Sequence, residues 1–285
     1  MSIIRSSPRS KITAFVFFIC ITNSAPCFAD QQSIPPAKAI QFEGDPAFTP
    51  KPLTLQGYLR HPDGAGRYPA IVLLHGCGGF AERLDQRWGQ RLASWGYVTL
   101  TIDSFGPRGI GSICGSRFPR DLDFDAYRGL NFLVRQPFVN AKRVVAMGFS
   151  QGGSLALLSV ERGAIEQTYE NKFRAAAAFY PVCDGLTGIT TAPALILIGE
   201  RDEFTRGCRD LAEGRGGDFG MSRSPGEGAG IRLVVYPDAY QGFDVPGFKT
   251  PVEYLGHHLE FNQSATDQSI DALREFLHAT VGSRQ

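Results

Sequence analysis

Six short runs of mostly apolar residues recur along the chain and are separated by longer amphipathic segments. Continuous hydrophobicity over such short runs is typical of strands that are covered on both faces, as in a parallel sheet. The runs are residues 70–74, 97–102, 143–146, 173–180, 193–198 and 231–236. The segments with helical character are residues 85–95, 121–135, 154–158 and 264–278. This alternation predicts an α/β fold, with a mostly parallel twisted sheet and helices on both faces.

The N-terminal part of the chain follows a different pattern. Residues 12–21 are apolar, follow three basic residues and are too short to span a bilayer as a helix. Small residues at the expected cleavage positions predict that residues 1–29 are a secretory signal, removed after Ala29. The remaining residues, 30–285, are then expected to form a single α/β domain that is periplasmic or secreted and has no membrane contact.

The first residues of that domain predict little regular structure. Residues 30–51 contain four prolines and are expected to form an irregular arm. Residues 53–59 alternate between apolar and polar side chains, which predicts an edge strand of an antiparallel hairpin.

Composition excludes several classes of protein. Of the 285 residues, 43% are hydrophobic and 20% are charged, which is typical of a globular protein. The net charge is +1, and it falls by three when the leader, with three basic and no acidic residues, is removed. The chain therefore has no excess of basic residues that would indicate binding to nucleic acid or to an anionic membrane.

Four cysteines remain after removal of the leader: Cys77, Cys114, Cys183 and Cys208. Four cysteines in an exported protein allow two disulfides with three possible pairings. Each cysteine follows the carboxyl end of a predicted strand, so we favour the pairs Cys77–Cys114 and Cys183–Cys208, on loops from neighbouring strands. No pair has zinc-ligand spacing, and we expect no metal and no cofactor.

The segment Gly148-Phe149-Ser150-Gln151-Gly152 places a serine at a sharp turn between a predicted strand and a predicted helix. This is the sequence context of a nucleophile elbow, where glycines permit close backbone approach and the serine hydroxyl is exposed above the strand ends. The start of the helix also leaves free N–H groups near the serine. We therefore expect Ser150 to be a catalytic nucleophile.

A serine hydrolase further needs donors that bind the oxyanion of the tetrahedral intermediate. The backbone N–H of Gln151 is the first expected donor. The second should come from the loop after residues 70–74, which reads His75-Gly76-Cys77-Gly78-Gly79, and the N–H of Cys77 is the best placed.

The acid and the base should follow the nucleophile in the chain, after later strands. Asp202 follows the strand at 193–198 and is the expected acid. The base should come after the last strand, where the sequence has Gln241 instead of a histidine. An amide cannot accept and return a proton near neutral pH, so Gln241 cannot act as a general base.

At this point the chain resembles the dienelactone hydrolase family of the α/β-hydrolase fold, from about residue 53 to 277. The resemblance is carried by the segments H-G-C-G-G, G-F-S-Q-G-G, G-E-R-D and Y-P-D-A-Y-Q-G-F-D. It implies hydrolysis of a small-molecule ester or lactone. In relatives the last segment reads A-x-H-G-F and its histidine is the base, so Gln241 stands at the histidine position. The family's namesakes also carry cysteine at the position of Ser150 and glutamate at that of Gly76.

Three interpretations follow from Gln241. The protein is a hydrolase that has lost its base, naturally or by engineering; or another histidine serves; or the site binds ligands without turnover. His257 and His258 are the alternative bases, because they follow Gln241 on a segment that can fold back over the site.

A dinucleotide oxidoreductase is disfavoured. Gly76, Gly78 and Ala81 match the glycine fingerprint of such proteins, but the match follows a hairpin and leaves the elbow unexplained.

Overall fold

The structure is a computed structural model that describes residues 36–44, 53–116, 118–215, 223–224 and 226–282. The chain separates into two units, residues 1–31 and 32–285. The predicted signal peptide lies outside the described residues. Within the described ranges, no helix is both long enough and apolar enough to cross a membrane.

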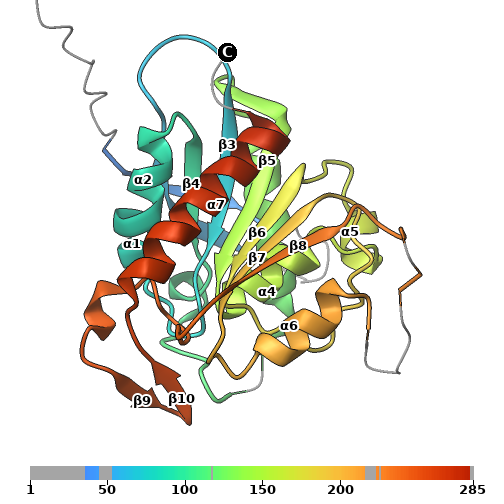
Figure 1. Ribbon diagram of the computed structural model, residues 1–285. Helices are drawn as coiled ribbons and strands as arrows, with labels where there is room; N and C mark the ends of the chain where they lie inside the picture. Colours follow the sequence, from blue (N-terminus) through green and yellow to red (C-terminus); the bar gives the residue numbers. More distant parts are fainter. Residues whose placement is uncertain (1–35, 45–52, 117, 216–222, 225, 283–285) are drawn as a thin grey trace, which may run out of the picture. The chain divides into compact units, whose positions relative to one another are not determined.

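An eight-stranded sheet forms the centre of the second unit, in the order β1-β2-β4-β3-β5-β6-β7-β8 (Figure 1). The strands from β4 to β8 in this order are parallel, whereas β2 pairs antiparallel with both β1 and β4. The strands are β1 Lys38–Glu43, β2 Thr54–Arg60, β3 Tyr68–Leu74, β4 Val98–Asp103, β5 Val139–Phe149, β6 Ala175–Phe179, β7 Ala194–Gly199 and β8 Ile231–Tyr236. A separate hairpin pairs β9, Val252–Tyr254, with β10, His257–Leu259.

All six predicted apolar runs lie in strands of this sheet. Every side chain of β3, β6 and β7 is buried, so both faces of the sheet are covered at its centre. The structure therefore confirms the predicted fold, a mostly parallel sheet with helices packed on it.

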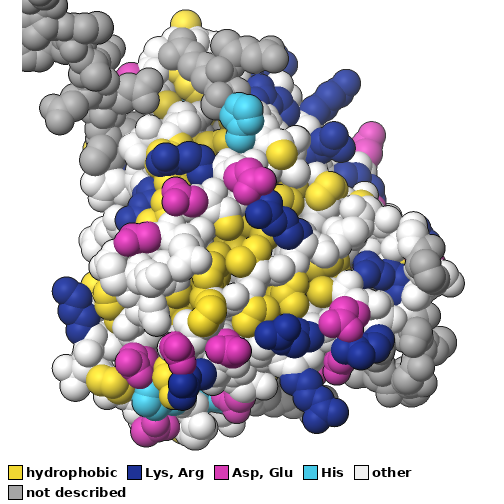
Figure 2. All heavy atoms as spheres, in the orientation of Figure 1, with side chains coloured by type: hydrophobic (Ala, Val, Ile, Leu, Met, Phe, Trp, Pro, Cys, Tyr) yellow, Lys and Arg dark blue, Asp and Glu magenta, His cyan; other side chains and the backbone are white. Residues whose placement is uncertain are grey.

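The helices follow the strands as expected, with shifted ends. They are α1 Ala81–Leu84, α2 Gln90–Ser94, α3 Asp125–Val134, α4 Gln151–Leu158, α5 Ala164–Thr168, α6 Thr205–Ala212 and α7 Gln263–Val281, with shorter turns η1 Asp85–Gly89, η2 Gly106–Arg108, η3 Arg120–Phe124 and η4 Pro246–Phe248. The closing helix α7 crosses the near face of the sheet in Figure 1 and packs against β5, β6 and β7. Figure 2 shows acidic and basic side chains interspersed on this face.

Two predictions for the N-terminal part were wrong. Part of the expected irregular arm is the regular strand β1, and residues 53–59 are not an edge strand, because β2 is paired on both sides. The physical reason is that Phe42 is buried and Ile40 half-buried, so a run of only six residues gains enough from packing to join the sheet.

Candidate active site

The predicted elbow is a tight turn between β5 and α4. Ser150 has a φ of 51° and a ψ of −121°, a conformation that a non-glycine residue rarely adopts. A Cβ atom at Gly148 would lie 1.9 Å from the carbonyl oxygen of Gly152, and one at Gly152 would lie 2.3 Å from that of Leu74. Both positions therefore require glycine. The turn is held by a 2.9 Å hydrogen bond from the N–H of Ser150 to the carbonyl of Phe179.

Gln241 lies against the hydroxyl of Ser150. Its side-chain Nε2 donates a 3.0 Å hydrogen bond to Ser150 Oγ, although the two residues are 91 positions apart. The side chain is buried, and its backbone carbonyl accepts a 3.3 Å hydrogen bond from the N–H of Glu260, beyond the β9–β10 hairpin. The amide therefore occupies the place beside the serine that a base needs.

Asp202 lies in the turn after β7 and is 6% exposed. Its Oδ1 accepts a 3.0 Å hydrogen bond from the N–H of Phe204. Its Oδ2 is buried and has no partner among the described residues. Burial raises the pKa of this carboxyl to about 7, against the opposing effect of the Phe204 N–H.

The loop that carries Gln241 packs on the turn that carries Asp202. The N–H of Arg201 donates a 2.9 Å hydrogen bond to the carbonyl of Ala239. A Cβ at Gly199 would lie 2.2 Å from that same carbonyl oxygen, so the two loops approach closely only because position 199 is glycine. The expected acid turn and the expected base loop are therefore neighbours.

The expected oxyanion donors belong to two segments next to Ser150. The loop after β3 passes close to the serine, because a Cβ at Gly76 would lie 3.4 Å from the Cβ of Ser150. Cys77 follows in this loop. Gln151 is the first residue of α4, where backbone N–H groups have no acceptor within the helix.

His75 is held in a neutral form beneath this loop. Its Nε2 accepts a 3.2 Å hydrogen bond from the N–H of Ser104, so the proton resides on Nδ1, which donates to the carbonyl of Gly76 at 2.9 Å. Burial lowers the pKa of the ring. We therefore assign His75 a structural role in the loop.

The two alternative bases, His257 and His258, lie in β10 and hydrogen bond to carboxylates. His257 Nδ1 hydrogen bonds to the carboxylate of Glu203. His258 contacts Glu253 through Nδ1 at 2.5 Å and Glu260 through Nε2 at 2.9 Å, and these hydrogen bonds raise its pKa. When the His258 ring is protonated, both of its nitrogens donate and it has no lone pair with which to take a proton.

Both favoured disulfides are present. Cys77 is bonded to Cys114, with a Cα–Cα distance of 4.9 Å, and Cys183 is bonded to Cys208, with a distance of 5.0 Å. Each bond joins segments that follow adjacent strands, β3 with β4 and β6 with β7, although Cys208 lies in helix α6 and not in a loop as expected. Disulfides of this kind are typical of proteins outside the reducing cytosol.

Sequence reasoning missed the buried group that anchors the Gln241 loop. The carboxylate of Asp244 accepts hydrogen bonds of 2.6 Å from Trp88 Nε1 and from the hydroxyl of Tyr180. The Arg87 guanidinium is 3.5 Å away. The neighbouring Phe243 packs in the same aromatic cluster. The only sequence signal was the position of Asp244 three residues after Gln241, which does not reveal its partners.

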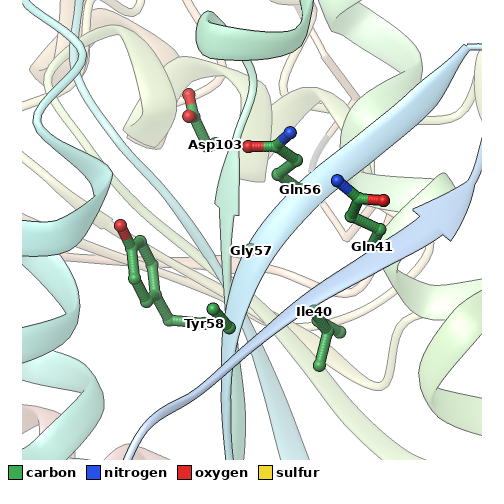
Figure 3. Close-up of a pocket in the computed structure, with 7 residues that line it drawn as sticks. Ile40, Gln41, Gln56, Gly57, Tyr58 and Asp103 are labelled. Carbon is green, nitrogen blue, oxygen red and sulfur yellow. The ribbon is translucent and has the colours of Figure 1, made fainter.

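A groove of about 300 Å³ lies elsewhere, at the edge of the sheet. Figure 3 shows the side chains of Gln41, Gln56 and Asp103 pointing to the same side, beside Tyr58. The three polar residues form one cross-strand row, because each is paired in register with the next. The groove contains none of the expected catalytic residues. Among the described residues, no group of three or more His, Cys, Asp or Glu side chains is arranged to hold a metal ion.

The fold, together with a serine at a strained strand-to-helix turn, defines an α/β hydrolase. The sequence matches the dienelactone hydrolase family over residues 55–281, and the chain belongs to that family.

Solved structures share the fold at low sequence identity. One is a dienelactone hydrolase-like promiscuous phosphotriesterase from metagenomic libraries, with a TM-score of 0.65 and 18% identity over 86% of this chain and 99% of that chain. Another is a putative dienelactone hydrolase from Klebsiella pneumoniae subsp. pneumoniae, with a TM-score of 0.60 and 17% identity over 84% and 98%. At these identities the likeness establishes the fold alone.

A curated relative is closer in sequence over a shorter range. Lipase 1 of Moraxella sp. (strain TA144) is 30% identical over 152 residues, which are 52% of this chain and 42% of the lipase. The chain therefore matches less than half of the length of that relative.

Proposed function

We propose that this protein is an exported carboxylic ester hydrolase that uses Ser150 as its nucleophile and acts on small esters or lactones. Gln241, at the position of the base, limits its turnover. The observation that carries the proposal is the hydrogen bond from Gln241 Nε2 to Ser150 Oγ, at the mouth of a strained elbow. Membership of the dienelactone hydrolase family and the lipase relative support the choice of ester substrates. The basic and apolar leader and the two disulfides support export.

The proposed reaction begins with attack of Ser150 Oγ on the substrate carbonyl. The carbonyl oxygen becomes an oxyanion that accepts hydrogen bonds from the N–H groups of Cys77 and Gln151. The Gln241 amide donates to the serine oxygen and does not take its proton, so the proton leaves to solvent. Loss of a triad member leaves roughly a thousandfold to ten-thousandfold acceleration over water, which defines the expected scale of activity.

A second candidate is ligand binding without turnover. The same hydrogen bond favours it, because the amide holds the serine oxygen as an acceptor and does not activate it as a nucleophile. The two candidates differ in one measurable property, which is covalent reaction at Ser150.

The test is labelling of the protein with a fluorophosphonate, followed by mass spectrometry of the modified peptide. Ser154 provides a matched control on the same helix, because its hydroxyl is engaged with the backbone of Val182 at 2.8 and 3.0 Å. We expect labelling of the parent and of Ser154→Ala, at Ser150, and none of Ser150→Ala. Hydrolysis of p-nitrophenyl acetate should show the same order. Turnover that depends on Ser150 would eliminate the binding-only candidate. Absence of labelling at Ser150, even in Gln241→His, would overturn the proposal that the protein is a serine hydrolase.

A further inference from the structure

The loop of residues 104–116, called the clamp loop, contacts the expected oxyanion loop, residues 75–79. The contact is made by the first two residues of the clamp loop and by His75. The N–H of Ser104 donates to His75 Nε2 at 3.2 Å. The ring of Phe105 packs edge-on against the His75 ring, with 4.5 Å between centroids. The His75 Nδ1 and the N–H of Gly79 both donate to the carbonyl of Gly76, at 2.9 and 3.0 Å.

These contacts fix the direction of the Cys77 N–H. The carbonyl of Gly76 and the N–H of Cys77 belong to one planar trans peptide, so they point in opposite directions. Two donors on the Gly76 oxygen therefore orient the N–H as well. On the other side of Cys77, its carbonyl accepts hydrogen bonds from Ile113 N at 3.0 Å and Ser112 Oγ at 3.2 Å.

The disulfide completes the restraint. Cys77 Sγ is covalently bonded to Cys114, in the same clamp loop that supplies the donors to the Cys77 carbonyl. The clamp loop thus holds the peptide plane after Cys77 and the Cys77 side chain, whereas the plane before Cys77 is held by His75 and Gly79, of which His75 contacts the clamp loop in turn. A loop rich in glycine would otherwise leave this N–H free to rotate.

The clamp loop is itself anchored. Arg108 donates to the carbonyl of Ser104 at 2.6 Å and forms ion pairs with Asp121 and Asp125. Asp125 is fully buried and also pairs with Arg128. At the far end, a Cβ at Gly115 would lie 3.2 Å from a methyl of Leu255, at the tip of the β9–β10 hairpin. The clamp loop therefore has a rigid base and a packed end.

We infer that Cys114 is a positioning residue: through its disulfide, the clamp loop holds the N–H of Cys77 in the orientation that binds the oxyanion. The inference rests on the proposed function. It assigns to this disulfide a role in transition-state stabilisation, and to the Cys183–Cys208 disulfide a role in stability only.

The test compares Cys114→Ala with Cys208→Ala. The two disulfides span 37 and 25 residues, so opening either one should cost a similar amount of chain-entropy stabilisation. Two quantities are measured in each full-length protein: the hydrogen–deuterium exchange rate of residues 75–79, and the saturable kinetics of Ser150 labelling by a fluorophosphonate. Thermal unfolding confirms that each variant is folded.

We expect Cys114→Ala to raise exchange at residues 75–79 and to lower the maximal labelling rate by about tenfold, with the half-saturating concentration unchanged. Complete removal of an oxyanion donor costs about 10²–10³-fold, and a loosened donor should cost less. Cys208→Ala should change neither quantity. Equal effects of the two variants, or unchanged exchange and labelling in Cys114→Ala, would overturn the inference. If the parent does not label at all, the proposed function fails, whereas the exchange comparison still decides whether the clamp exists.

Discussion

Replacement of Gln241 by histidine is expected to restore a general base. The Nε2 atom of Gln241 is 3.0 Å from Ser150 Oγ. In histidine, Nε2 is separated from Cα by the same number of bonds as in glutamine, so an imidazole on this backbone reaches the serine hydroxyl. Its lone pair accepts the serine proton, which the amide N–H cannot do. A positioned general base contributes about 10²–10⁴-fold to the rate, and we expect a gain of that size in kcat/KM.

The same change supplies a donor to Asp202. The Oδ2 of this carboxyl is buried and has no hydrogen-bond partner in the part of the chain that the structure describes, and burial raises the pKa of the carboxyl to about 7. An imidazole Nδ1–H at position 241 would donate to Oδ2, which favours the carboxylate and lowers its pKa. The imidazole must be neutral to act as a base. The rate of Gln241→His should therefore rise with pH through the pKa of the new His–Asp pair and then level off.

The assay is p-nitrophenyl acetate hydrolysis by the parent, Gln241→His, and Gln241→His combined with Ser150→Ala. Gln241→Met is the matched control, because it keeps the length of the side chain and removes its polar atoms. Only Gln241→His should gain activity, and the added Ser150→Ala should abolish the gain. A folded Gln241→His protein that gains less than tenfold, or one whose gain survives loss of Ser150, would refute the reasoning.

Three further predictions concern stability. The pKa of Asp202 is raised from 3.8 to about 7, so its native form binds more protons than its unfolded form across this range. Between pH 5 and pH 8 the parent should therefore lose about 2–3 kcal/mol more unfolding free energy than Asp202→Asn, measured in urea; parallel pH profiles would contradict this. A Cβ at Gly148 would lie 1.9 Å from the Gly152 oxygen, whereas one at Gly163 would meet nothing within 4 Å. Gly148→Ala should thus lower the unfolding free energy, measured in urea, by about 3 kcal/mol or more. Gly163→Ala should lower it by less than about 1 kcal/mol. Asp244→Ala leaves two buried donors without an acceptor and should lower the unfolding free energy by about 3–5 kcal/mol; a loss below about 1 kcal/mol would show that water replaces the carboxylate.

Local patterns predicted the fold and the elbow because their causes are local. A continuous apolar run indicates burial on both faces, and Gly148 is required by a close approach of the backbone within a few residues, whereas Gly152 is required by the distant Leu74. The disulfide pairing was also predictable, since parallel strands end at the same edge and neighbouring loops bring their cysteines together. The choice of pairs required only the order of strands.

The remaining features depend on contacts between distant residues. Nothing in the sequence around His257 reveals that Glu203, 54 positions earlier, contacts it. The sequence analysis did not predict β1 because its six residues lie beside prolines and are too few to show a clear alternation of apolar and polar side chains. The strand is stabilised by its antiparallel pairing with β2. The contact of Gln241 with Ser150 was expected only through the family resemblance, and composition or spacing could not have supplied it.

Two features of the site lower the stability of the fold, and a site that only binds a ligand would not need them. Above pH 7, the shift of the Asp202 pKa from 3.8 to about 7 destabilises the fold by about 4 kcal/mol. The conformation of Ser150, with φ at 51°, costs a further 1–3 kcal/mol or so. Ser150 donates a backbone hydrogen bond to Phe179 and Asp202 accepts one from Phe204, and under the proposed function both residues serve acyl transfer once a histidine joins them. Under the proposed function, replacement of the side chain at position 241 is the single change that would complete a triad. That is why the Gln241→His variant separates a hydrolase that lacks its base from a fold that has been adapted to bind.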